Sequence, residues 1–233
     1  MQSAELRRMT PARVGLGRTG NAVPLRAVLD FQLAHARARD AVHFPFDGPG
    51  LAAELGGVLV RSAARDRAEY LRRPDLGRRL SEAGRAALAG AAGDWDLVPV
   101  VADGLSPVAV HRNAPELIRL LGTGLEGWRL APPVVVEQGR VAIGDEIGAL
   151  VGASLAVVLI GERPGLASPD SMGVYVTWNP LPGRTDAERN CISNIRPEGL
   201  APGAAAGLLR LLLARARGNR LTGVALASAG KLN

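Results

Sequence analysis

The side chains best suited to chemistry lie in two short segments in the last third of the 233-residue chain. Residues 160–166 (IGERPGL) end an apolar, strand-like run, and residues 189–197 (RNCISNIRP) contain the lone cysteine. Both segments place polar atoms where a predicted strand ends. In an α/β sheet, the loops that leave the carboxyl ends of parallel strands line the ligand-binding crevice. The two segments therefore predict a ligand-binding site.

The carboxylate of Glu162 has two interpretations that the sequence leaves open. It stands one glycine after the apolar run of residues 155–160 and just before a Pro-Gly turn. As a structural residue, it would accept hydrogen bonds from backbone amides in the turn or pair with Arg163. As a functional residue, it would accept hydrogen bonds from amides or hydroxyls of a large ligand, because loops at strand ends are rich in binding residues.

The side chains of Cys191 and Val141 favour structural interpretations when each is taken alone. Free cysteines usually behave as small buried hydrophobic residues, so we expect Cys191 in the core. The alternative is a reactive thiol whose pKa is lowered by Arg189, two positions earlier. Val141, in the segment GRVAIGDEIG (139–148), is typical of an apolar residue in the first turn of a helix.

The segment GLGRTG (15–20) matches the G-x-G-x-x-G fingerprint of dinucleotide-binding sites, but its setting does not. No strand pattern precedes it, and no strand followed by an acidic residue about twenty positions on completes the ribose-binding half, because Asp40 and Asp47 sit in or after a predicted helix. We therefore expect a flexible turn that leads into a helix. The histidines (His35, His43 and His111) are scattered, and no serine lies in a G-x-S-x-G elbow, so neither a protein metal site nor a serine hydrolase is predicted.

The composition predicts an α/β protein. Hydrophobic residues make up 47% of the chain and aromatic residues only 3%, so the core must come from Ala, Val, Leu and Ile. Such a core suits helices packed on a parallel sheet. The net charge of +6 comes from arginines spread along the chain, without a dense tract or interleaved aromatics. We therefore expect a solvated surface and no nucleic-acid partner, the alternative being a patch that faces an acidic protein or an anionic cofactor.

The order of the predicted elements divides the chain into a helical region, 1–93, and an α/β domain, 94–233. The first region shows a helix from about Pro24 to Asp40 and two or three further helices over 51–92. Strands then alternate with helices, which predicts crossover connections and a doubly wound, mostly parallel sheet. The expected strands are 97–101, 134–136, 155–160, 174–178, 191–195 and 221–227, and the expected helices are 107–121, 143–151 and 204–217.

Six blocks together resemble the small subunit of the ethanolamine ammonia-lyase family. They are RVGLGRTG (13–20), VADGLS (101–106), GRV (139–141), DEIG (145–148), IGERPGL (160–166) and NCISNI (190–195). Their order and spacing agree with the family over almost the whole chain. The most specific pair is IGERPGL with CISNI about thirty residues later.

The resemblance implies one subunit of an adenosylcobalamin-dependent carbon–nitrogen lyase that converts ethanolamine to acetaldehyde and ammonia by radical chemistry. It implies a large catalytic subunit of the TIM-barrel type, with which this chain forms large–small pairs in a hetero-oligomer. Residues 94–233 are then expected to form a Rossmann-like cobalamin-binding domain at the subunit interface. Residues 1–93 are expected to dock on the large subunit.

Matched block by block, the family's cobalamin contacts fall on Val141, Glu162 and Cys191. A corrin has a broad apolar face with a rim of amides, so Val141 and Cys191 suit the face and Glu162 suits the rim. The chain lacks the D-x-H-x-x-G segment whose histidine replaces the lower base in many cobalamin proteins. We therefore expect dimethylbenzimidazole to remain on the cobalt, and we place no catalytic residue and no metal ligand on this chain.

Two other functions remain open at this point. The chain could stabilise the large subunit without a catalytic role, or it could be an independent nucleotide-binding α/β enzyme that uses residues 15–20. One cysteine cannot form an internal disulfide, and no apolar run reaches membrane-spanning length. We therefore expect no membrane contact and a cytoplasmic location, either free or, as in some relatives, inside a bacterial microcompartment.

Overall fold

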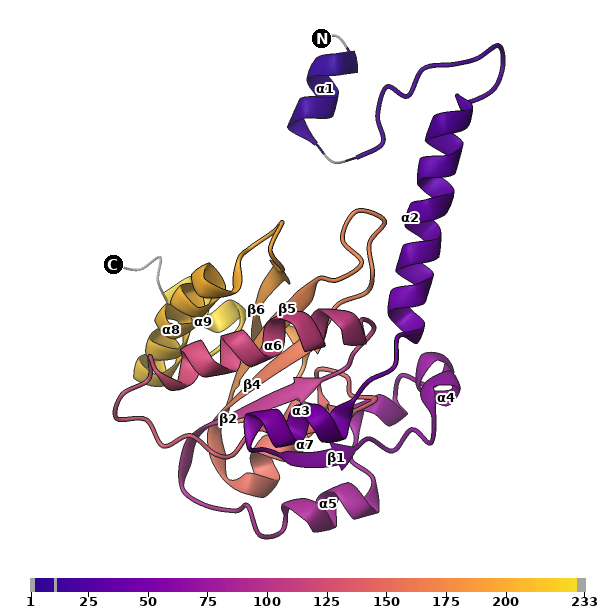
Figure 1. Cartoon of the computed structure of the whole chain (residues 1–233). Coiled ribbons are helices and arrows are strands. Elements are labelled where there is room, and N and C mark those ends of the chain that lie inside the picture. The colour runs from indigo at the N-terminus through magenta and orange to yellow at the C-terminus, as the bar shows by residue number, and fades with distance from the viewer. Residues whose placement is uncertain (1–2, 11, 230–233) are drawn as a thin grey trace.

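A computed structural model describes residues 3–10 and 12–229 of the chain (Figure 1). The helices are α1 (Ser3–Met9), α2 (Leu25–His43), α3 (Gly48–Leu55), α4 (Arg67–Arg72), η1 (Leu76–Arg78), α5 (Glu82–Leu88), α6 (Pro107–Gly122), α7 (Ile143–Val151), η2 (Asp186–Glu188), α8 (Pro202–Asn219) and α9 (Val224–Ala229). The strands are β1 (Val58–Arg61), β2 (Trp95–Ala102), β3 (Val134–Glu137), β4 (Ala153–Gly161), β5 (Met172–Trp178) and β6 (Arg189–Ile195).

Within the described residues, six strands form one mixed sheet in the order β1-β3-β2-β4-β5-β6. The pairs from β1 to β4 are parallel, whereas β4 with β5 and β5 with β6 are antiparallel. The α/β class is thus confirmed, but the expectation of a mostly parallel sheet is wrong at this edge. The reason is local: the connections that flank β5 contain no crossover helix, and a parallel pair needs one.

The central strands feed two hydrophobic cores, because successive side chains of a strand point to opposite faces of the sheet. Leu97 and Val101 of β2 pack with α3, α6 and α8 on one face. Val98 and Val100 of the same strand pack with α5 and α7 on the other face. Helices therefore cover both faces, as a doubly wound fold requires.

The chain changes direction at β2, which lies between β3 and β4. It leaves β2 through α6 to form β3 on one side, and then returns through α7 to form β4 on the other side. Ligands of open α/β sheets bind beside the carboxyl ends of strands at such a switch point. Counted from β2, the strands follow the other common doubly wound order, 2-1-3-4-5, and not the classic Rossmann order 3-2-1-4-5-6.

Two expected elements differ from the structure. The first ninety residues were expected to be all-helical, but β1 lies among them and pairs with β3 at the edge of the sheet. Its four residues sit between a Gly-Gly turn and an Ala/Arg-rich segment, too short a run to show alternation. The expected strand at 221–227 is wrong as well: Gly223 has a φ of +74° and the helix α9 follows.

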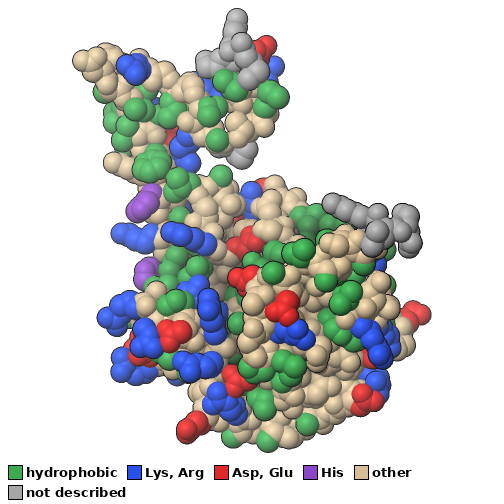
Figure 2. All heavy atoms as spheres, turned by 180° about the vertical axis from the view of Figure 1, so that it is seen from behind, with side chains coloured by type: hydrophobic (Ala, Val, Ile, Leu, Met, Phe, Trp, Pro, Cys, Tyr) green, Lys and Arg blue, Asp and Glu red, His purple; other side chains and the backbone are tan. Residues whose placement is uncertain are grey.

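The N-terminal segment projects from the sheet domain (Figure 1). α2 has only Ala34 and Ala41 buried along its length. Large apolar side chains on it are exposed, among them Leu25, Leu29 and Leu33. Figure 2 shows hydrophobic side chains on this projecting lobe. Among the helices described, none is both long and apolar enough to cross a membrane.

Candidate functional site

A cavity of about 370 Å³ opens at the carboxyl ends of β2, β3 and β4. The turn after β2 contributes Gly104 and Leu105, the segment after β3 contributes Val141, and the end of β4 contributes Glu162. Tyr175 of β5 lines the same cavity. Its position is therefore the one that the sheet topology predicts for a ligand.

Val141 lies in the turn between β3 and α7, before the first residue of the helix rather than within its first turn. Its side chain is half-buried and packs against the core on the α5 and α7 face, as does Tyr175. The Val141 carbonyl accepts the amide of Gly144 at 3.1 Å, which tightens the start of α7. One apolar side of the cavity is therefore fixed by the helix that follows.

The carboxylate of Glu162 ties the end of β4 to β6. Its Oε1 accepts a hydrogen bond from Ser193 Oγ at 2.5 Å, and its Oε2 accepts one from the Asn194 amide at 3.3 Å. The hydroxyl of Ser171 also donates to Oε2. The partners of this carboxylate among the described residues are thus Ser171, Ser193 and Asn194, and no ion pair to Arg163 is found there. A carboxylate has about four acceptor positions, which leaves it room for a further donor.

Cys191 lies opposite Tyr175 in the antiparallel β5–β6 pair. The expectation of a core cysteine is wrong, because Cys191 is exposed. Its neighbours Ile192 and Ile195 point to the core on the α8 face, so Cys191 belongs to the opposite face of this edge strand. The three residues expected from the resemblance therefore come near one another: Val141 and Glu162 line one cavity, and Cys191 adjoins it through Tyr175.

The thiol of Cys191 is not activated as a nucleophile. Desolvation raises its pKa, a hydrogen bond from Tyr175 acts against this, and the negative charge of Glu162 raises it further. Arg189 does not act on the thiol, because its guanidinium is directed to Asp145. Cys191 therefore offers a small, weakly polar contact surface rather than a reactive thiolate.

Tyr70, Arg140 and Tyr175 are among the cavity residues that the sequence did not predict. Tyr70 of α4 is fully buried, and its hydroxyl donates to the Gly139 carbonyl at 2.9 Å. The guanidinium groups of Arg67 and Arg140 lie 5.0 and 4.4 Å from the centre of its ring. Tyr70 lies in the region expected to be a separate helical part, about seventy positions before its partner, and no local pattern links the two.

Asp103 holds the segment after β3 against the end of β2. Its Oδ1 accepts the Gly139 amide at 3.0 Å, and its Oδ2 accepts Arg67 at 3.0 Å. Burial raises the pKa of Asp103 to about 7, although Arg67 and backbone amides act in the opposite direction. Asp103 and Tyr70 together fix both polar groups of the Gly139 backbone. This explains why the blocks VADGLS and GRV occur together.

Gly104, which follows Asp103, must remain a glycine. Its φ is +58°, and a Cβ there would lie 2.2 Å from the Gly161 carbonyl oxygen. We expect Gly104→Ala to lower the free energy of unfolding by about 1–3 kcal/mol, through backbone strain and displacement of the end of β4. Urea-induced unfolding of the purified chain checks this. The matched control is Gly207→Ala in α8, where a Cβ meets nothing within 4 Å and no loss is expected; equal losses in both variants would contradict the assignment.

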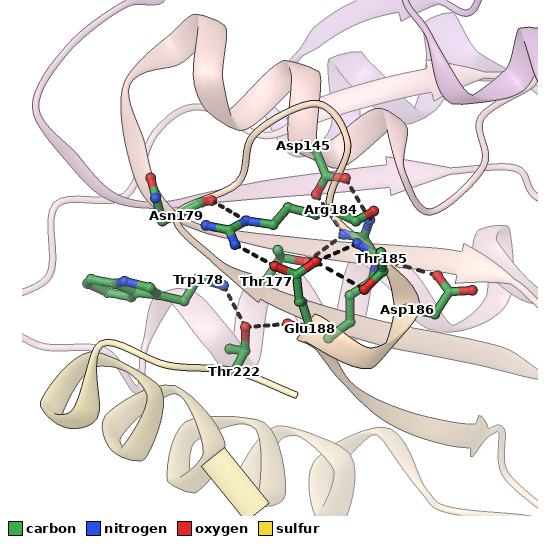
Figure 3. Close-up of polar contacts among 10 residues, drawn as sticks. Asp145, Thr177, Trp178, Asn179, Arg184, Thr185, Asp186, Glu188 and Thr222 are labelled. Carbon is green, nitrogen blue, oxygen red and sulfur yellow. Dashed lines mark hydrogen bonds and ion pairs between the residues drawn. The ribbon is translucent and has the colours of Figure 1, made fainter. Parts of the chain in front are cut away.

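A buried ion pair anchors the strand that carries Cys191. Arg189, at the start of β6, donates to Oδ1 and Oδ2 of Asp145 of α7, each at 2.6 Å. The same guanidinium donates to Thr177 Oγ1 and to the Arg184 carbonyl, both at 2.9 Å. Figure 3 shows Asp145, Thr177, Arg184 and Glu188 converging at this point. The blocks DEIG and NCISNI thus meet through the arginine that directly precedes the second block.

The other candidates from the sequence have structural roles. The glycine-rich segment 15–20 follows the helix α1 rather than a strand, and Gly15, Gly17 and Gly20 have positive φ. The segment ends in a tight turn in which Thr19 pairs with Ala22, shortly before α2 begins. His111 of α6 is half-buried, and its Nε2 accepts the Asp47 amide at 3.1 Å. In the described ranges, no three His, Cys, Asp or Glu side chains are grouped as metal ligands.

Comparison with known proteins identifies the family. A family model described as "Ethanolamine ammonia-lyase light chain (EutC)" matches residues 2–227. A protein of Pseudomonas fluorescens (strain SBW25), named ethanolamine ammonia-lyase small subunit, is 57% identical over 231 residues, which cover 94% of this chain and 83% of the relative. A second protein named ethanolamine ammonia-lyase small subunit, from Pseudomonas syringae pv. tomato (strain ATCC BAA-871 / DC3000), is 53% identical over an alignment of 240 residues. The alignment covers 98% of this chain and 84% of the relative. The chain therefore belongs to the family of ethanolamine ammonia-lyase light chains, the small subunits of that lyase.

Proposed function

We propose that this chain, as the small subunit of an ethanolamine ammonia-lyase, binds adenosylcobalamin at its interface with the large subunit. The observation that carries the proposal is the convergence of Val141, Glu162 and Tyr175 on one cavity, with Cys191 exposed beside it. These residues come from the ends of β3 and β4 and from the β5–β6 pair. They meet where an open α/β sheet binds its ligands.

The chemistry of these residues suits a corrin. Half-buried Val141, the ring of Tyr175 and exposed Cys191 offer an apolar wall, and Glu162 offers acceptor oxygens to amide N–H groups. A cofactor of this size cannot be enclosed by a cavity of about 370 Å³, so a second surface must complete the site. The word "small" in the names of the relatives implies a larger partner that would supply it.

When bound, adenosylcobalamin would supply the radical chemistry of the reaction. The residues of this chain bind and orient the corrin and exclude water from one side of it. The raised pKa of the Cys191 thiol argues against a proton-transfer role at the wall. We place no catalytic residue on this chain, and we expect the dimethylbenzimidazole base to remain on the cobalt. The substrate would be held by the large subunit, in a barrel of the TIM type.

The projecting α2 is the surface that we assign to docking on the large subunit. An amphipathic helix normally buries its apolar stripe, yet Leu25, Leu29 and Leu33 are 71, 54 and 51% exposed. They recur every fourth residue, so they lie one turn apart on the same face of the helix and form a continuous apolar surface. We place the resulting hetero-oligomer of large–small pairs in the cytoplasm, free or within a bacterial microcompartment.

Reconstitution tests the proposed function. Purified large subunit, adenosylcobalamin and ethanolamine are combined with or without this chain, and acetaldehyde formation is followed. We expect turnover only with the chain present, because the cofactor site is incomplete without it. If the soluble large subunit alone turns ethanolamine over as fast as the mixture, the chain is a stabilising subunit. Tight nucleotide binding by the isolated chain in calorimetry would instead support an independent nucleotide-binding enzyme.

A further inference from the structure

Arg140 is held rigidly at the edge of the cavity that Val141 and Glu162 line. Its guanidinium lies 4.4 Å from the centre of the Tyr70 ring, and its backbone amide donates to the Gly77 carbonyl at 2.8 Å. Gly77 also packs against the aliphatic part of the side chain, since a Cβ on Gly77 would approach Arg140 Cγ to 2.9 Å. The Arg140 side chain therefore has little conformational entropy to lose when a ligand binds.

The guanidinium of Arg140 lacks a polar partner in the part of the chain that the structure describes. Its Nε is buried and makes no hydrogen bond there. Arg67, which lies over the same tyrosine ring, is fully engaged: it pairs with Asp103 at 3.0 Å and donates to the carbonyls of Val42 and Gly104. Buried N–H groups are nearly always hydrogen-bonded in native proteins. Nε is closed off from the cavity, but the two terminal nitrogens are not buried and also make no hydrogen bond in the described residues, so their N–H groups are free to meet an acceptor on a ligand there.

The charge balance of the cavity favours an anionic acceptor. Arg140 and Arg163 line it against a single carboxylate, Glu162, whose oxygens already accept hydrogen bonds from Ser193 and Asn194. A guanidinium forms its strongest hydrogen bonds with carboxylate and phosphate oxygens, which match its planar fork of donors. The cavity is thus suited to a phosphate group rather than to a neutral amide alone.

We propose that Arg140 binds the phosphodiester of the nucleotide loop of cobalamin, the anionic group of that cofactor, through its free guanidinium N–H groups. The inference rests on the proposed function and deepens it, because it assigns recognition of the lower nucleotide to a residue of this chain. Arg163, exposed at the same cavity, adds long-range attraction for the same charge. A site of this kind would select complete cobalamin over corrinoids that lack the nucleotide loop.

The test compares two corrinoids on the assembled large–small complex. Cyanocobalamin contains the phosphodiester, and cyanocobinamide lacks the whole nucleotide loop. Equilibrium dialysis with detection of corrin absorbance gives both dissociation constants without any turnover. We expect Arg140→Gln to weaken cyanocobalamin binding about 10- to 100-fold, as for the loss of a charged hydrogen bond, and to change cyanocobinamide binding less than about threefold. Arg140→Lys should fall between the wild type and Arg140→Gln, because it keeps the charge but not the planar stack on Tyr70.

Arg78→Gln is the matched control: Arg78 is exposed, follows Gly77, and lies outside this cavity, so both corrinoids should bind as to the wild type. Urea-induced unfolding of each variant complex checks that the fold is intact. Equal weakening of the two corrinoids by Arg140→Gln, or no weakening of either, overturns the phosphodiester contact while cobalamin binding by the wild type still stands. If the wild-type complex binds cyanocobalamin no more tightly than the large subunit alone, the proposed function itself fails.

Discussion

Replacing Asp145 with alanine is expected to lower the free energy of unfolding by about 3–5 kcal/mol, because Arg189 then stays buried without its carboxylate. The side chains of the pair are 2 and 1% exposed, and both carboxylate oxygens accept from the guanidinium at 2.6 Å. For a chain of this length, the loss corresponds to about 6–20 °C in the melting midpoint. Urea-induced unfolding of the purified chain, followed by circular dichroism, measures it.

The matched control for this variant is Asp186→Ala. Asp186 faces the same guanidinium at 3.6 Å, but its side chain is 99% exposed, so solvent screens the interaction and little change is expected. The double variant Asp145→Leu with Arg189→Met should recover much of the stability, since apolar groups often replace a buried pair without loss. If Asp145→Ala and Asp186→Ala lower the free energy of unfolding by similarly small amounts, the buried pair does not anchor β6.

Glu162→Ala is expected to weaken binding of adenosylcobalamin to the assembled enzyme by about ten- to a hundredfold, or about 1.5–3 kcal/mol. In the proposed site, the carboxylate accepts hydrogen bonds from the corrin amides and also holds Ser193 and the Asn194 amide beside Cys191. The substitution removes the acceptor and loosens this part of the wall. Equilibrium dialysis with corrin absorbance measures the dissociation constant.

Two further variants separate these roles of Glu162. Glu126→Ala removes an exposed carboxylate outside the cavity and should leave the affinity unchanged. Ser171→Ala removes one donor to Glu162 from a buried residue that does not line the cavity. Its effect on affinity should be much smaller than that of Glu162→Ala. An unchanged affinity in the Glu162→Ala complex would remove Glu162 from the site.

The strands and α-helices from β2 to α8 were predicted from the sequence within a few residues, whereas the short η2 was not. Strands β2, β3 and β4 are buried on both faces, so each is a continuous run of apolar residues that local composition reveals. β1 and α9 could not be assigned in the same way. Each is a short segment with few buried side chains, and what decides its conformation is a distant partner: β3 for β1, and η2 with α8 for α9.

The sequence predicted where the site lies in the fold, but not the contacts that its residues make. Glu162 was placed at the end of a central strand, but its hydrogen bonds to Ser193 and Asn194 depend on an antiparallel β5–β6 pair that was not predicted. Cys191 was expected in the core because its residue type is usually buried, whereas β6 is an edge strand whose second face is open. Tyr70 had no local signal, because its role depends on a contact between α4 and the segment after β3.

A structure of the assembled large–small complex with bound cobalamin, determined by electron cryomicroscopy, tests the central claim most directly. We predict that the corrin lies against Val141 and Cys191, that a rim amide donates to Glu162, and that the α2 helix is covered by the large subunit. The account would be contradicted if the cobalamin were enclosed by the large subunit alone, with the cavity between the ends of β2, β3 and β4 open to solvent.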